Sequence, residues 1–434
     1  MLLLPLLLAG CASHADRLHE VCNHFYAGEL DAAVTTLDDD IKKHGREAEC
    51  FKLDRAIVDL VSGRPQDAEK LLREVRDSLD HNQQASLAES AGAMVTDDTV
   101  TAYAGEDYER VLIRAFLAIS SLMHGGDDAR AYALQTTDLQ EQIIENGTDE
   151  SGKNLKLEYK RVALGAYIDG MLREQNPMDA ADAARSWTKV VSWQPDFPFG
   201  NADVERAVHG RHSRPGNGVL YVFTLVGRGP VKIEKEETGA TIAMLLGDRI
   251  LSYTGKQTLP PTIAMIKVPQ VVPSYNTING VQVWVDGQSA GNTATITDVT
   301  QLATQQCEAI YPQTLGRAVA RRMAKKGIVY GVKEATNVTK GSALGFAGDV
   351  VGVVWEASEV ADCRCWGLLP NQIQVLRIEM PAGDRRVGLS PVGRCGALPP
   401  REATVHIADG RNSYLLADFV DDHILGKIVT SDKP

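Results

Sequence analysis

Seven cysteines are the residues of this 434-residue chain that could most directly do chemistry. Cys363 and Cys365 stand two apart in the segment DCRCW, and His209 and His212 stand three apart in the segment HGRH. Thiolates and imidazoles are common zinc ligands, so a mixed site can be drawn from these four residues. However, the spacing matches no standard zinc motif, and the histidines lie in a Gly- and Pro-rich stretch without the glutamate of a metalloprotease helix. We therefore predict no metal site and no cofactor.

Disulfide formation is the alternative chemistry for the same thiols, provided that the compartment is oxidising. If Cys11 carries a lipid, six cysteines remain, which is an even number. The 35-residue repeat described below offsets Cys50 from the position equivalent to Cys22 by about 10 to 12 Å along the helix axis, too far for a disulfide. The favoured disulfide joins Cys395 to Cys363 or to Cys365, and both pairings stay open.

Acid–base and nucleophilic sites find less support. Glu106, Asp107 and Glu109 in the segment GEDYER could act as paired carboxylates. The favoured interpretation is a solvated helix N-terminus, where acidic side chains complement the helix dipole. We predict neither a phosphate loop of the GxxxxGK[ST] type nor a nucleophile elbow of the GxSxG type. We therefore predict a protein that is not an enzyme.

The first residues, MLLLPLLLAGCAS, form an apolar run that is too short to span a bilayer. Leu8, Ala9, Gly10 and Cys11 resemble the lipobox of bacterial lipoproteins, although no Lys or Arg precedes the run. We expect residues 1–10 to be a signal peptide and Cys11 to be lipidated. Ala12, where an aspartate would favour the inner membrane, favours the periplasmic face of the outer membrane. The alternative is an apolar leader that arose by chance.

Residues 11–208 are predicted to be helical, with a period of 35 residues. Glycine, alanine and leucine recur in a tetratricopeptide-like register at Gly28, Ala33 and Leu37 and again at Gly63, Ala68 and Leu72. The glycine lets one helix turn into the next, and the alanine lets the two helices approach closely. A partial third copy comprises Gly126, Ala131 and Gln135, and a weaker fourth one Asn176 and Ala181. The alternative is an irregular helical bundle.

Residues 209–218 are predicted to be a linker, because Pro and Gly cluster there without an apolar period. Beyond it, residues 219–434 show strand patterns at 219–226, 281–287 and 373–380. Asp409 and Gly410 between two β-rich runs predict a hairpin. The fold class is therefore α+β, with an all-α domain followed by a mainly antiparallel β-rich domain that contains a few helices.

Two further segments of the second half have competing interpretations. A basic helix carries Arg317, Arg321, Arg322, Lys325 and Lys326. A solvated face is favoured there over a surface for an acidic partner or lipid head groups. In EVADCRCWGLLP, Trp366 and Pro370 could bracket a recognition loop. The favoured interpretation is a corner, with Trp366 packed on the sheet, Pro370 fixing the entry into a strand, and Asp362 and Arg364 as supports.

Three segments resemble the signature segments of an uncharacterised family of bacterial lipoproteins. They are YAGEDYERVL (103–112), GNGVLYVFTLVGRGPVKIE (216–234) and EVADCRCWGLLPNQIQVLRIEMPAG (359–383). The resemblance implies a lipid-anchored protein with tetratricopeptide-like helices and a strand-rich C-terminal domain. It supplies no activity and no catalytic residues. In some genomes, members look like gene neighbours of a lipoprotein activator of penicillin-binding proteins. The cysteine-rich segment DCRCW departs from the family pattern and suggests a local disulfide in this chain.

The expected function is that of a non-catalytic scaffold in the cell envelope, which binds envelope proteins through its helical domain. Its net charge of −12 argues against nucleic acid as a partner, and the sequence identifies no small-molecule ligand. One alternative is a regulator or activator of a cell-wall (peptidoglycan) synthase. A second is an envelope enzyme with an unrecognised site.

Overall fold

The computed structural model describes residues 14–89, 102–148, 152–209, 211–238, 265–335, 360–393 and 396–431, without the side chains of 85–89 and 323–335. The signal peptide (1–10), Cys11 and Cys395 lie outside the described residues, so the lipid anchor and the disulfide partner stay predictions. Lys325 and Lys326 lie in the part of a helix whose side chains are not described. None of the described helices is long and apolar enough to cross a membrane.

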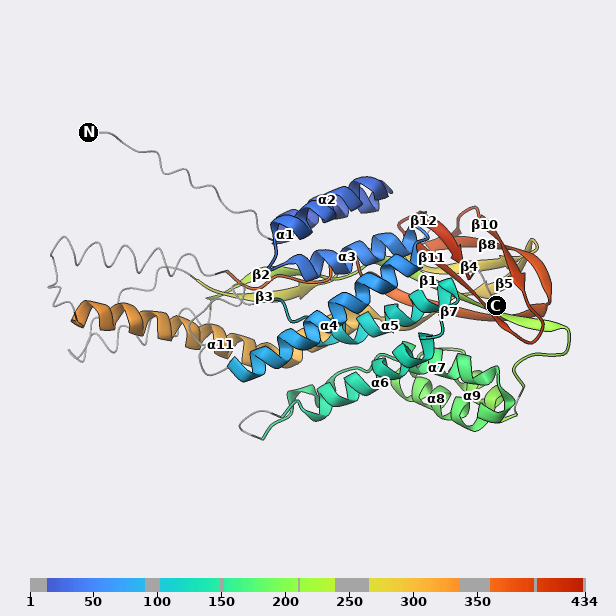
Figure 1. Ribbon diagram of the computed structural model, residues 1–434, viewed down its shortest axis with the longest axis horizontal. Coiled ribbons are helices and arrows are strands. Elements are labelled where there is room, and N and C mark those ends of the chain that lie inside the picture. The colour runs from blue at the N-terminus through green and yellow to red at the C-terminus, as the bar shows by residue number, and fades with distance from the viewer. Residues whose placement is uncertain are drawn as a thin grey trace.

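The first half is an array of helices, each of which packs against the next one along the chain (Figure 1). The α-helices are α1 (His14–Tyr26), α2 (Leu30–Lys43), α3 (Ala48–Val61), α4 (Pro65–Glu89), α5 (Asp107–His124), α6 (Ala129–Glu145), α7 (Leu164–Glu174), α8 (Ala180–Trp193) and α9 (Gly200–Val208). Two short 3-10 helices, η3 (Leu155–Glu158) and η4 (Pro177–Asp179), precede α7 and α8.

The repeat register is confirmed for its first two copies. Gly28 and Gly63 have φ angles of 78° and 81°, a left-handed conformation that glycine adopts without strain. The alanine and leucine that follow each glycine are buried. The third copy was placed wrongly, because Gly125 with φ 69° makes the turn and Ala131 is exposed. In the fourth, Ala181 is exposed and Ala183 takes the buried position.

The second half contains two main sheets and a two-stranded ribbon. Its strands are β1 (Asn217–Arg228), β2 (Val231–Glu237), β3 (Ile266–Val272), β4 (Ile278–Val285), β5 (Gln288–Asn292), β6 (Ala294–Asp298), β7 (Pro370–Pro381), β8 (Gly383–Gly393), β9 (Gly396–Ala397), β10 (Arg401–Ile407), β11 (Asn412–Val420) and β12 (His423–Thr430). The first sheet has the order β12-β11-β1-β7-β6 and the second β10-β8-β4-β5, with β9 paired to β8. The α+β prediction is confirmed. Pairing is antiparallel throughout the described strands except between β1 and β11.

The first sheet lies between the helices and the second sheet. Along β1, Tyr221, Phe223 and Leu225 join the core that the helices form, whereas Leu220 and Val222 join the core between the two sheets. This alternation follows from the period of two along a strand. Because both faces are covered, β1 is buried along almost its whole length, which explains its continuous apolar sequence.

The predicted hairpin at Asp409 and Gly410 is wrong. Strand β10 before this turn belongs to the second sheet, and β11 after it belongs to the first. The turn is therefore a corner between the sheets. It is tied to the start of β1, since Asp409 accepts a hydrogen bond from the Gly216 N–H at 3.0 Å and the Gly410 N–H donates to the Asn217 carbonyl at 2.9 Å. β11 then pairs with β1 rather than with β10.

Gly218 in this corner should not tolerate a side chain. A Cβ atom added there would lie 2.2 Å from the Ala408 carbonyl oxygen. We expect Gly218→Ala to lower the free energy of unfolding by about 3 kcal/mol, because the backbone would have to move. Gly410→Ala is the matched control, since it meets no atom within 4 Å and only its φ of 69° is unfavourable for alanine. Urea denaturation of both variants measures the difference, and equal losses would contradict the close approach.

The ribbon β2–β3 and the long helix α11 (Val299–Ala335) form an arm that extends from the body along the long axis of the molecule (Figure 1). The described part of α11 packs along β3, where Ile266 and Val268 contact Ala318. The predicted solvated basic face is wrong for two of its residues. Arg321 and Arg322 are buried, and Arg322 donates to the Met265 carbonyl at 3.2 Å.

Candidate functional site

Three distant parts of the chain meet where the helices, the ribbon and the first sheet join. Lys232 of β2 donates to Glu106 Oε1 at 2.5 Å and to the Arg364 carbonyl at 3.2 Å. Glu109 of α5 accepts a hydrogen bond from the Trp366 N–H at 2.7 Å. Glu106, Glu109, Lys232, Asp362 and Arg364 are called the junction cluster below. They come from the same three segments on which the predicted family resemblance rests.

Glu109 is the centre of this cluster and is fully buried. It accepts hydrogen bonds from the hydroxyl groups of Tyr103 and Tyr108 and from the backbone N–H groups of Glu106 and Trp366. Burial raises the pKa of its carboxyl group, and the negative charge of Glu106 raises it further. The prediction of a solvated helix N-terminus is therefore wrong for Glu109, although Glu106 and Glu109 do form a capping box at the start of α5.

Lys232 is a buried cation held by acidic neighbours. Burial alone would lower its pKa, but the carboxylates of Glu106 and Asp362 outweigh this and raise the pKa above its usual value. The ammonium group therefore stays charged. A buried lysine that acts as a base or nucleophile needs a lowered pKa, so this arrangement does not favour that chemistry.

Arg364 and Asp362 form a two-pronged ion pair, with N–O distances of 2.9 and 2.7 Å. Burial tends to raise the pKa of Asp362, but Arg364 and then Lys232 lower it. Arg364 also donates to the Arg46 carbonyl at 3.2 Å and lies over the ring of Tyr103. The predicted supporting role of these two residues is confirmed.

The segment after Arg364 is a buried corner, as predicted, and not an exposed recognition loop. Trp366 is 1% exposed, and β7 begins at Pro370. The packing partner of Trp366 differs from the prediction, because the indole lies against Phe116 of α5 with ring centroids 5.3 Å apart. Asp54 of α3 holds the same corner through the Leu368 N–H at 2.8 Å.

Cys22, Cys50, Cys307, Cys363 and Cys365 form no disulfide with one another. Cys22 and Cys50 are unpaired, as the repeat spacing predicts. Because Cys395 lies outside the described residues, its pairing with Cys363 or Cys365 stays a prediction. Burial raises the pKa of Cys363 to about 11 and that of Cys22 to about 12. It also raises the pKa of the buried Cys50 and Cys365.

Cys307 should be the first of these five thiols to react with a maleimide in the native protein. It is half-buried and lines a cavity, whereas Cys50 and Cys365 are buried. Burial also raises the pKa of Cys22 and Cys363, which disfavours the reactive thiolate form of these two residues. Peptide mass spectrometry after a short pulse of reagent measures the order. In urea all five should react at similar rates, and faster native labelling of Cys50 or Cys365 than of Cys307 would contradict the assignment.

The two histidines and the two cysteines that were considered as zinc ligands lie at opposite ends of β1. His212 precedes β1 and hydrogen-bonds Asn412 at 2.6 Å, while His209 is exposed at the end of α9. Cys363 and Cys365 precede β7, whose first residue pairs with the last residue of β1. The twelve residues of β1 span about 36 Å. Within the described parts of the chain, no group of three or more His, Cys, Asp or Glu residues could hold a metal.

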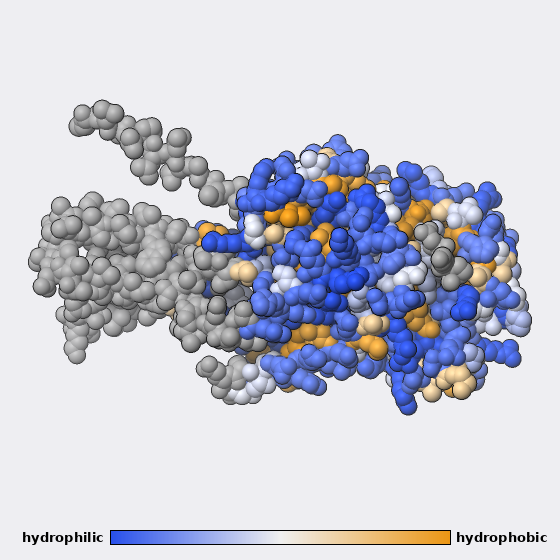
Figure 2. All heavy atoms as spheres, in the orientation of Figure 1, coloured by the Kyte–Doolittle hydropathy of each residue, from blue (hydrophilic) through white to orange (hydrophobic). Residues whose placement is uncertain are grey.

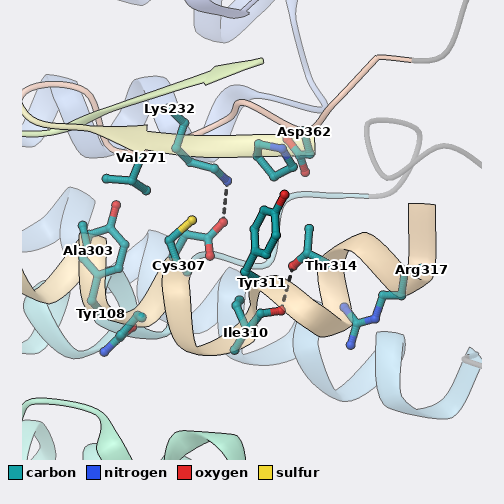
Figure 3. Close-up of a pocket in the computed structure, with 13 residues that line it drawn as sticks. Tyr108, Lys232, Val271, Ala303, Cys307, Ile310, Tyr311, Thr314, Arg317 and Asp362 are labelled. Atoms are coloured by element: carbon teal, nitrogen blue, oxygen red, sulfur yellow. Dashed lines mark hydrogen bonds and ion pairs between the residues drawn. The ribbon is translucent and has the colours of Figure 1, made fainter. Parts of the chain in front are cut away.

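A cavity of 230 Å³ opens beside the junction cluster, between β3 and α11 (Figure 3). Lys232 points into it from the ribbon, and Tyr311 points into it from α11. Glu106 and Asp362 lie at its wall, and Arg317 lies at its outer end. Part of the junction cluster thus forms one wall of a space that a small ligand could enter.

Sequence reasoning missed Lys232 and Asp54. Lys232 alternates with Val231 and Ile233, the pattern of a residue on the solvated side of a strand, so no local signal indicated burial. Asp54 did carry a signal, because it lies on the apolar side of α3, away from the stripe of charged residues Glu49, Lys52, Arg55 and Asp59.

The structure joins the three segments of the resemblance in one cluster, but it assigns them no chemistry beyond hydrogen bonds and ion pairs. The resemblance to a lipoprotein family stays a prediction. Comparison of the chain with protein-family models, with curated proteins and with solved structures finds no match.

Proposed function

We propose that this protein is a lipid-anchored scaffold on the periplasmic face of the bacterial outer membrane, which binds envelope proteins and does not catalyse a reaction. One observation supports the proposal that the protein does not catalyse a reaction. The groups of the junction cluster that could do acid–base or nucleophilic chemistry are bonded to one another or to the backbone. These hydrogen bonds and ion pairs hold the helices, the ribbon and the sheet together, as a rigid binding platform requires.

The surface for a partner would lie on the outer helices. In repeat arrays the inner helices often line a concave binding surface. Here α3, α5 and α7 are buried along most of their length, and their side chains share one core with β1, β7 and β11. The even-numbered helices α2, α6 and α8 bury only one stripe each. The visible face of the molecule is mainly hydrophilic with scattered apolar patches (Figure 2).

Exposed apolar side chains mark positions from which to test this surface. Leu134 on α6 and Met178 in η4 are both exposed. A photocrosslinking amino acid at either position should capture the same envelope protein in living cells. Leu398, which is exposed between β9 and β10, is the matched control and should capture nothing or a different protein. Capture of lipid alone at Leu134 and Met178, or the same capture at Leu398, would contradict the scaffold; a captured cell-wall synthase would support the regulator alternative.

The anchor is tested separately. Cys11→Ala should abolish lipid labelling and release the protein into the periplasm, as measured by metabolic labelling with a fatty-acid analogue and by fractionation. Cys22→Ala is the control, because that thiol is half-buried in α1 and should not carry lipid. Continued membrane attachment of Cys11→Ala would rule out the anchor without bearing on the partner surface.

A further inference from the structure

The cavity between β3 and α11 has the form of a slot. Along α11, its lining residues recur every three or four positions from Ala303 to Arg317, so one face of the helix forms one wall. Those fourteen positions correspond to about 21 Å along the helix axis. On the opposite side, Pro269 and Val271 of β3 contribute apolar surface. A volume of 230 Å³ spread over this length fits a narrow, extended ligand rather than a compact one.

Gln306 supplies a hydrogen-bond acceptor without a donor. Its side chain is 8% exposed and lines the slot. Its Oε1 atom has no hydrogen-bond partner among the described residues. Buried polar atoms are almost always paired in folded proteins, so this oxygen is open to a donor, either an ordered water or a ligand in the slot.

Lys232 supplies a donor on the ribbon side of the slot. Its ammonium group has three N–H bonds, of which one is directed to Glu106 and one to the Arg364 carbonyl. No acceptor for the third is found in the described part of the chain. Since Lys232 lines the slot, a carbonyl oxygen of a ligand could accept this bond.

Arg317 supplies the unbalanced charge. Within the junction cluster, the carboxylates of Glu106 and Asp362 are matched by the cations Lys232 and Arg364. Arg317 is exposed at the outer end, and no ion pair joins it to another described residue. One unpaired guanidinium favours a monoanion. A polyphosphate would bring several negative charges close to the two carboxylates and is disfavoured.

A ligand that used all of these groups would have an N–H donor, a carbonyl acceptor, an apolar part and one anionic end. A short peptide has all four. Gln306 and Arg317 are eleven positions apart, about 16 Å along α11, and three extended residues span about 10 Å, with the rest covered by the reach of the side chains. We propose that the slot binds a peptide of about three residues, with its C-terminal carboxylate on Arg317 and its backbone on Gln306 and Lys232.

Two matched peptide pools test this proposal with the full-length protein. One is a tripeptide library with free C-terminal carboxylates, and the other is the same library with C-terminal amides. Peptides retained by the immobilised protein are identified by mass spectrometry. Enriched peptides are then tested for protection of Cys307, which lines the slot, against maleimide labelling. We expect enrichment and protection from the carboxylate pool and not from the amide pool.

Variants separate binding in the slot from binding elsewhere. Arg317→Gln should weaken binding of an enriched peptide about tenfold, the value of one charge-assisted hydrogen bond. Arg185→Gln, at an exposed arginine of α8, should leave binding unchanged. Thr314→Trp places bulk in the slot from a half-buried position and should abolish both retention and protection.

Three results would overturn the proposal. They are no enrichment from either pool, equal enrichment from both pools, and binding that survives Arg317→Gln and Thr314→Trp. Protection of Cys307 by inorganic phosphate as strong as that by the peptides would also overturn it, in favour of a simple anion site. None of these results depends on the lipid anchor or on capture of an envelope partner, so the slot and the scaffold function can fail independently.

Discussion

Asp418→Asn is expected to stabilise the protein by about 5 kcal/mol at pH 8 and to have little effect near pH 4. Asp418 is 4% exposed in β11, and its Oδ1 atom has no hydrogen-bond partner within the described residues. Burial raises its pKa to about 8, which a hydrogen bond from the Phe419 N–H opposes only in part. In the unfolded chain an aspartate has a pKa of about 3.9.

The direction in which stability changes with pH follows from these two pKa values. Between about pH 4 and pH 8, Asp418 is protonated in the folded protein and ionised in the unfolded chain, so the folded state holds one more proton. Unfolding then releases a proton, and stability falls by about 1.4 kcal/mol for each pH unit across this window. Asparagine has no proton to release, so the variant lacks this loss.

Urea denaturation at several pH values between 4 and 8.5 measures the effect as the difference between variant and wild type. Subtraction removes the contribution of other groups, such as Asp203, whose pKa burial raises to about 6. Asp422→Asn is the matched control, because this aspartate is largely exposed in the turn after β11. A difference for Asp418→Asn that stays constant with pH would contradict the buried, protonated carboxyl.

Glu109→Leu is expected to lower the free energy of unfolding by at least about 4 kcal/mol. The substitution removes the acceptor of four hydrogen bonds, two from tyrosine hydroxyls and two from backbone N–H groups. Each buried donor that loses its partner costs about 1 to 3 kcal/mol. Glu109→Gln keeps one acceptor oxygen and should lose about half as much.

Asp107→Asn is the control at the neighbouring position, where the carboxylate pairs with Lys156 at 2.6 Å near the surface and should be worth less than about 1 kcal/mol. Denaturation gives the stabilities, and hydrogen exchange at the Trp366 and Glu106 amides reports the loss locally. If Glu109→Leu were no less stable than the control, Glu109 would not hold the junction cluster together.

Much of the fold could be predicted because it is encoded locally. The runs at 219–226, 281–287 and 373–380 became β1, β4 and β7, since period and β-propensity need no distant partner. The turn after β4 also follows from its sequence, because Asp286 and Gly287 both adopt the positive φ angles that such a turn requires. The glycines of the first two helix pairs are predictable for the same reason.

What could not be predicted depends on residues far apart in the chain. The chemistry of a tight turn is the same for a hairpin and for a corner, so Asp409 and Gly410 do not reveal that β10 and β11 join different sheets. Likewise, Lys232 and Glu109 carry charges that normally stay in solvent. They are buried because partners more than a hundred positions away, Glu106 for Lys232 and Trp366 for Glu109, satisfy them.

Because β1 pairs in parallel with β11, the first sheet cannot form completely until the C-terminal strands have been synthesised. The register joins Val219 to Asn412, so the central strand lacks one neighbour until the last strands of the chain have been made. Until then the apolar sides of α3, α5 and α7 have only part of their cover. Pairing of segments so far apart in the sequence is slow, and an incompletely folded chain with exposed apolar surface is prone to aggregate. A polypeptide cut off before residue 412 should therefore aggregate rather than form a smaller stable body.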